Sequence, residues 1–220
     1  MFEKMKLQEY DIKSANANVM YTLNMIDKDL YEKLINMDKK ERVIYVGKMI
    51  KKDDTLYNEL MDGYKYYTDK FIKENGLEDN VYEVVKDAVW IFGKYPKKTE
   101  FNNYVKFTRD RVATSVMTLD KIKFYYNSIN NKLFNRGLGD IDFDTFPILK
   151  KIKEFMMYKE SDKYKILYKK IHKFHYNYIT ENVDESYRYN IRRKKDDIRH
   201  EDPMDDYNYK LIRLMIKYLL

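Results

Sequence analysis

Two acidic residues, Asp11 and Asp87, each lie in an apolar segment whose pattern predicts a β-strand. A carboxylate among bulky apolar residues is costly to bury unless it is paired or holds a cation. If the two strands are neighbours, both carboxylates can converge on the same Mg²⁺ ions, as two-metal phosphoryl transfer requires. Asp11 and Asp87 are therefore candidate metal ligands and catalytic residues.

A purely structural role is the alternative for both acids. Asp87 would then alternate out to solvent while Val85 and Val89 point inward, and Asp11 would cap the helix that follows it. These two interpretations differ in one measurable quantity, the separation of the two carboxylates.

The elements after Asp11 are expected to be helical. Apolar residues recur at helical spacing over residues 18–37, where Asp29 is the predicted cap between two short helices. Asp38 is the predicted cap of a helix that continues through residues 43–50. A longer helix is expected over residues 55–72, ended by Asn75 and Gly76.

The chain then changes to a strand pattern. Residues 81–92 are β-rich and end at Gly93, with Asp87 expected in mid-strand. Alternation resumes over residues 104–107, 112–119 and 122–126. These segments predict an antiparallel sheet, to which the short segment around Asp11 adds a strand.

Helical spacing returns after Gly139, over residues 146–178 and again over 207–220. Residues 187–203 are crowded with charge of both signs and are expected to form a solvated helix face or linker. The expected fold class is therefore α+β, with a domain at 1–140 followed by a helical region at 141–220.

Composition narrows the functional classes. The 220 residues include no Cys, so disulfides, thiolate metal sites and thiol nucleophiles are excluded. No apolar run reaches the ~20 residues that span a bilayer, and the charged N-terminal segment lacks the form of a signal peptide. The formal charge of +7 favours a polyanionic partner. We expect a cytoplasmic protein with no membrane contact.

The order of segments from about residue 11 to 140 resembles the palm of B-family DNA polymerases. The family has an Asp-aromatic-x-Ser-Leu-Tyr-Pro-Ser segment, which residues 11–16 (Asp-Ile-Lys-Ser-Ala-Asn) match at Asp and Ser. The family's strand with Tyr-Gly-Asp-Thr-Asp-Ser is similar to residues 84–92, with Asp87 on the second Asp and Val85 at the first. The resemblance implies a palm-like antiparallel sheet.

The resemblance also implies how a nucleotide would be bound. In the family a basic helical region between the two acidic motifs contacts the incoming triphosphate, and Lys39, Lys40 and Arg42 occupy the comparable stretch. Asn16 stands where the family has its sugar-selecting Tyr. These four residues are the expected nucleotide-binding residues.

Faint versions of two later family elements follow. Residues 121–125 resemble the Lys-Lys-x-Tyr element, and residues 136–140 resemble the Lys-Gly-Ile-Glu segment. The nucleic-acid-binding residues implied are Lys121, Lys123, Tyr125 and Arg136.

The resemblance implies a viral or phage protein of DNA replication that acts in the host cytoplasm. It would be a minimal Mg²⁺-dependent nucleotidyltransferase or a polymerase-like subunit, with nucleic acid and other replication or polymerase subunits as partners. One alternative is a non-catalytic protein that retains a palm scaffold and binds nucleic acid or a partner protein. Another is a helical interaction protein in which the strand cluster is incidental. The sequence has no Gly-rich phosphate loop, which excludes nucleotide binding by that route. A palm would need no such loop, because metals and basic helix residues would hold its triphosphate.

Overall fold

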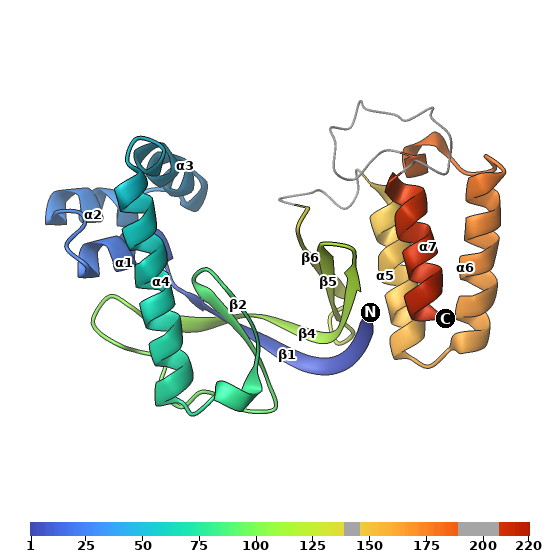
Figure 1. Ribbon diagram of the computed structural model, residues 1–220, viewed down its shortest axis with the longest axis horizontal. Coiled ribbons are helices and arrows are strands. Elements are labelled where there is room, and N and C mark those ends of the chain that lie inside the picture. The colour runs from blue at the N-terminus through green and yellow to red at the C-terminus, as the bar shows by residue number, and fades with distance from the viewer. Residues whose placement is uncertain (139–145, 189–206) are drawn as a thin grey trace. The chain divides into compact units, whose positions relative to one another are not determined.

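The computed structural model describes residues 1–138, 146–188 and 207–220 (Figure 1). The chain forms two compact units. The first unit is Leu7–Val112, and the second unit combines Met1–Lys6 with Ala113–Leu220. The boundary expected at residue 140 and most of the charged stretch 187–203 lie outside the described residues.

Six strands form one antiparallel sheet in the order β2-β3-β1-β4-β5-β6, which confirms the predicted α+β fold class. The strands are β1 (Phe2–Ile12), β2 (Val81–Val85), β3 (Ala88–Phe92), β4 (Phe107–Leu119), β5 (Ile122–Asn127) and β6 (Lys132–Arg136). Because β1 and β4 are long, each contributes residues to both units.

The first unit also holds the helices that were expected after Asp11. They are α1 (Ala15–Thr22), α2 (Lys28–Asn36), α3 (Lys39–Ile50), α4 (Asp54–Glu74) and the 3₁₀ turn η1 (Glu78–Asn80). Asp38 caps α3 as predicted, by accepting a hydrogen bond from the Lys40 backbone N at 2.8 Å. The cap of α2 is Asp27 rather than Asp29, because the Asp27 carboxylate accepts from the Leu30 backbone N.

Alternation along the strands determines which face of the first unit is apolar. Tyr10 and Ile12 of β1 and Val89 and Ile91 of β3 pack into one core cluster with Phe71 of α4. Since neighbouring residues of a strand point to opposite faces, Asp11 is directed away from this core.

Two strand predictions needed correction. Residues 81–92 form two strands joined at Lys86 and Asp87, so Asp87 lies in a hairpin turn rather than in mid-strand. Lys86 adopts the left-handed conformation that the turn requires, with φ 52°. Strand β4 is continuous from Phe107 to Leu119, through a charged stretch that lacked the expected alternation.

The second unit ends in a helical region, as predicted. Its helices are α5 (Pro147–Glu160), α6 (Tyr164–Ile179), the 3₁₀ turn η2 (Glu185–Arg188) and α7 (Tyr207–Leu219). The three long helices pack side by side (Figure 1) and share one core with β5, which includes Phe124, Phe155 and Tyr178. Within the described ranges, no helix is long and apolar enough to cross a membrane.

Candidate functional site

A polar cavity of about 320 Å³ lies in the first unit and brings together half of the residues that the sequence singled out: both acids and three of the four expected nucleotide-binding residues. Its walls come from the end of β1, the start of α1, helix α3, the β2-β3 turn and the start of β4. The lining residues are Asp11, Ile12, Lys13, Ser14, Ala15, Asn16, Lys39, Arg42, Val43, Asp87, Thr108 and Asp110.

The backbone places Asp11 and Asp87 next to each other. Strand β1 pairs antiparallel with β3, so that Asp11 lies opposite Ala88, the first residue after the turn. The Ile12 backbone N donates to the Asp87 carbonyl oxygen at 3.2 Å and fixes the turn against the end of β1. The two acids are therefore neighbours in space.

The two carboxyl groups interact strongly. Burial, followed by the charge of the neighbouring Asp87 carboxylate and a hydrogen-bonding contact with it, raises the pKa of Asp11 to about 8. Glu9 and Asp110 contribute in the same direction more weakly. The Asp11 Oδ1 atom is buried and has no hydrogen-bond partner among the described residues. Without a cation, Asp11 therefore holds a proton up to about pH 8.

Helix α3 brings positive charge to the same cavity. Lys39 and Arg42 line it, and the Arg42 side chain is held in part by a hydrogen bond from its Nη1 to the Leu34 carbonyl oxygen at 3.4 Å. Lys40 is exposed and lies outside the cavity lining. Two of the three expected basic residues therefore face the acids across one cavity.

Asn16 lines the cavity and is held by a residue that the sequence did not single out. The Tyr64 hydroxyl of α4 donates to the Asn16 Oδ1. Tyr64 is 3% exposed, and its pKa is raised by burial and then by the charges of Asp87 and Asp11, which places the phenol beside the acidic pair. Because the amide oxygen is occupied, the Asn16 NH₂ group remains to donate.

Gly63 explains how Tyr64 approaches the start of α1. A Cβ atom at Gly63 would lie 2.7 Å from Val19 Cγ1 and 2.6 Å from Leu23 Cδ1, both in or next to α1. Only a glycine allows α4 to pack this closely against α1. The Gly63-Tyr64 pair therefore positions Asn16.

Asp110 and Thr108 of β4 are cavity residues that sequence reasoning missed. The Thr108 hydroxyl lies 3.5 Å from the Asp11 carbonyl oxygen, at the limit of a hydrogen bond. Asp110 adds a third carboxylate to the lining. Its sequence signal was weak because it lies between Arg109 and Arg111, where the strand shows no apolar alternation.

The expected nucleic-acid-binding residues lie in the second unit. Lys121 is exposed in the β4-β5 turn, and Lys123 of β5 is paired in register with Arg136 of β6. Tyr125 is only 2% exposed, so its ring belongs to the interior and offers no free face to a base.

The oxygen atoms of Asp11 and Asp87 could supply part of a Mg²⁺ coordination shell. Asp11 and Asp87 offer hard oxygen ligands, one of them an unpartnered buried oxygen. In the described part of the chain, no group of three or more acids or histidines could hold a metal by itself. Mg²⁺ is commonly bound through one or two carboxylates together with water and substrate phosphates, so the pair suffices if a substrate supplies the remaining oxygens.

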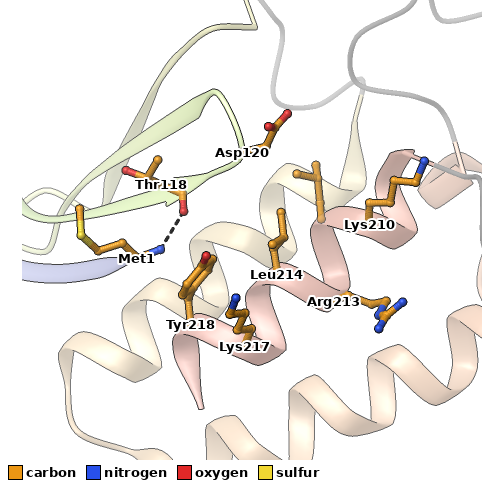
Figure 2. A pocket seen from close by; sticks show the side chains of 9 residues that line it. Met1, Thr118, Asp120, Lys210, Arg213, Leu214, Lys217 and Tyr218 are labelled. Carbon is orange, nitrogen blue, oxygen red and sulfur yellow. Dashed lines mark hydrogen bonds between the residues drawn. The ribbon is translucent and has the colours of Figure 1, made fainter.

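A larger cavity, of about 770 Å³, lies in the second unit (Figure 2). Helix α7 lines it with Lys210, Arg213 and Lys217 and with the apolar side chains of Leu211 and Leu214. Asp120 is the single acid among its described lining residues. It therefore lacks the paired carboxylates that make the smaller cavity chemically suited to hold a metal.

Comparison with known proteins places the chain in a phage family. No curated protein matches it. The bacteriophage PBS1 gene 130 protein family matches residues 2–219, in agreement with the expected phage origin. Because this match covers nearly the whole chain, the protein belongs to the bacteriophage PBS1 gene 130 protein family.

Proposed function

We propose that this phage protein is a metal-dependent nucleotidyltransferase whose active site is the Asp11–Asp87 cavity. The observation that carries the proposal is that Asp11, at the end of β1, and Asp87, in the β2-β3 turn held against it, line one cavity together with Lys39 and Arg42. The palm resemblance required adjacent acids, and it is the reason for preferring nucleotidyl transfer to other metal chemistry.

The acids would act first by holding cations. Asp11 and Asp87 repel each other when both are ionised, and divalent ions shared between them relieve that repulsion. Mg²⁺, when bound, would neutralise phosphate charge and activate an attacking oxygen. Val85 stands where the polymerase family has its first hairpin Asp, and Asp110, although it lines the cavity, pairs with Arg111 at 3.4 Å, so the proposed ligands are Asp11 and Asp87 alone.

The basic residues would act by holding the triphosphate. Lys39 and Arg42 are spaced three residues apart on α3, so both side chains reach the same face of that helix and the same cavity. Their charges balance the phosphates that remain after metal binding. Asn16, with its oxygen occupied by Tyr64, would donate its NH₂ to the sugar or a phosphate oxygen.

The function would be exercised on nucleic acid in the host cytoplasm. The formal charge of +7 favours a polyanionic substrate, although charge alone does not select DNA or RNA. Both template types therefore belong in the test, and other replication subunits are proposed partners.

The test is nucleotide incorporation by the full chain. Primer–template DNA and RNA would be incubated with labelled nucleoside triphosphates and either Mg²⁺ or Mn²⁺. We expect incorporation that requires the metal and that falls at least about 100-fold in Asp11→Asn and in Asp87→Asn, since each removes a ligand. Asp62→Asn is the matched control, because Asp62 is exposed on α4 outside the cavity lining.

Two outcomes would overturn the enzyme proposal. One is the absence of incorporation by the wild-type protein with every template and metal. The other is incorporation that persists in both cavity variants. If the inactive protein still binds nucleic acid at low salt, the non-catalytic scaffold is the correct interpretation.

A further inference from the structure

Helix α6, in the second unit, carries lysines and no acidic residue. Its 16 residues include four Lys and two His, and no Asp or Glu. The inner side of the helix is apolar and packs into the core through Leu167, Ile171 and Tyr178. The opposite side is exposed to solvent and is the subject of the inference.

Aromatic rings form a row along this exposed side. Tyr168, His172 and Tyr176 follow one another at intervals of four residues, so they lie along one face of the helix. Tyr168 is 57% exposed and Tyr176 is 61% exposed. The Tyr168 and His172 rings are in contact, with centroids 4.3 Å apart. Exposed aromatic side chains in a row are unusual for a helix that serves only to cover a core.

A row of lysines runs beside the rings. Lys165, Lys169 and Lys173 are also spaced four residues apart and are exposed. None of the three pairs with a carboxylate in the described ranges. Lys170, by contrast, points toward α5 and pairs with Glu154 at 2.7 Å. The unpaired ammonium groups are therefore confined to the side that carries the rings.

Positive charge continues from α6 onto α7. Arg213 projects from α7 (Figure 2) and lies close enough to contribute, after burial and His172, to lowering the pKa of His175. The described surface on this side of the two helices thus combines aromatic rings with cations from both. We name Tyr168, His172, Tyr176 and the three lysines the α6 face.

We infer that the α6 face binds single-stranded nucleic acid. Bases of any sequence stack on exposed aromatic rings, and phosphates are neutralised by adjacent lysines. The residues that carry the rings are spaced about 6 Å apart along the helix axis, and the Tyr168 and His172 ring centroids are 4.3 Å apart, so both spacings exceed the roughly 3.4 Å between bases in a duplex strand. A strand that stacks on them must therefore be extended, which a single strand can achieve and a duplex cannot. An acidic protein partner would use the lysines but not the row of rings.

This inference does not depend on catalysis at the Asp11–Asp87 cavity. The test is therefore carried out in EDTA, with fluorescence anisotropy of the full chain and labelled oligothymidylate, oligouridylate and a duplex of equal length. We expect tighter binding to the single strands than to the duplex. Asp62→Asn, exposed on α4 outside the cavity lining, should leave this binding unchanged. Because EDTA removes the metal that catalysis would require, failure of the enzyme proposal and failure of this inference give different results.

Two variants separate stacking from charge. Tyr168→Ala combined with Tyr176→Ala should weaken single-strand binding at least about tenfold, because each base–ring contact is lost. Replacing the three lysines with Gln should lower the slope of log affinity against log salt by about 2. The matched control for the rings is Tyr57→Ala with Tyr66→Ala, which removes two exposed tyrosines of α4 in the first unit.

The inference is overturned by any of three results. The first is that the wild-type chain binds none of the oligonucleotides. The second is that it binds the duplex more tightly than the single strands. The third is that the α6 tyrosine variant binds single strands as well as the α4 tyrosine control does. Since the replaced side chains are exposed, circular dichroism should show unchanged helix content in all variants. A loss of helix in the α6 tyrosine variant alone would also count against the inference, because it would assign the rings a structural role.

Discussion

Replacing Asp11 with Asn is expected to stabilise the metal-free protein and to do so more as the pH rises. Asp11 is buried beside Asp87, and its carboxyl group holds a proton up to about pH 8. Asn has nearly the same shape, carries no charge and can donate its amide hydrogen to the Asp87 carboxylate. The substitution therefore removes an electrostatic repulsion without opening a cavity.

The magnitude follows from the two states of the Asp11 carboxyl group. Its ordinary pKa is 3.8, whereas its folded-state pKa is about 8. Between about pH 4 and pH 8 the folded protein holds a proton that the unfolded chain has released, so the free energy of unfolding falls as the pH rises. One proton corresponds to roughly 1 kcal/mol per pH unit, or a few kcal/mol across the window. Above pH 8 both states are ionised and the loss is complete.

Thermal unfolding in EDTA from pH 5 to pH 8 would measure this effect. The Tm difference between Asp11→Asn and wild type should widen toward pH 8 and reach on the order of 10 °C there, at about 2–4 °C per kcal/mol for a chain of this size. The exposed control Asp62→Asn should follow the wild type in parallel. Parallel curves for Asp11→Asn, or a variant less stable than wild type at pH 8, would refute the proposed repulsion between the acids.

Two further predictions concern the cation and the helix contact. Mg²⁺ should raise the Tm of the wild type more at pH 8 than at pH 6, because the cation must displace the proton that the two acids share. The Tm of Asp87→Asn should not change when Mg²⁺ is added. Equal Tm shifts in the two proteins would contradict a metal site at the acidic pair. Gly63→Ala should lower the free energy of unfolding by about 1–2 kcal/mol, because crowding of the new methyl group against the buried Val19 outweighs the higher helix propensity of Ala. A Tm equal to or above that of the wild type would contradict this prediction and show that α1 can move aside.

Much of the first unit could be predicted from local patterns. The helices after Asp11 follow from apolar residues at helical spacing, and Asp38 is a cap because its carboxylate reaches a free backbone N–H group. Asp27 and Asp29 are both acids near the start of α2, and the sequence does not distinguish them. The residue that caps the helix is the one whose backbone stays extended, and the fold determines that this residue is Asp27.

The hairpin turn was harder to predict because its residues are uncharacteristic. Two-residue turns usually contain Gly or Asn where φ is positive, whereas this turn has Lys86 at φ 52°. The apolar residues on both sides therefore read as one long strand. Placing Asp87 in the turn changes its role, since a turn residue can point toward the end of a neighbouring strand without interrupting the apolar face.

Tertiary contacts determine the rest of the site. Tyr64 matched a helical apolar position, but its hydroxyl reaches Asn16 only because Gly63 lets two helices approach closely. Asp110 joins the cavity because β4 pairs beside β1, a contact between residues about 100 positions apart. Local sequence patterns carry no information about such pairings.

The cost of the acidic pair is the strongest physical argument that the cavity has a function. Asn at position 11 would fit the same space and remove the repulsion, and Asn or Gly at position 87 would suit a hairpin turn at least as well. A cavity serving only as structure gains nothing from two carboxylates that raise the pKa of Asp11 to about 8. In a cation-binding site the two carboxylates are useful because they are the metal ligands. Acids with shifted pKa values gather at functional sites for this reason. Lys39 and Arg42 line the same cavity and extend the argument. The Arg42 side chain donates to the Leu34 carbonyl oxygen, and among the described residues neither cation forms an ion pair with Asp11 or Asp87. These cations are therefore available to a ligand whose phosphates they would bind while the acids share divalent ions with it.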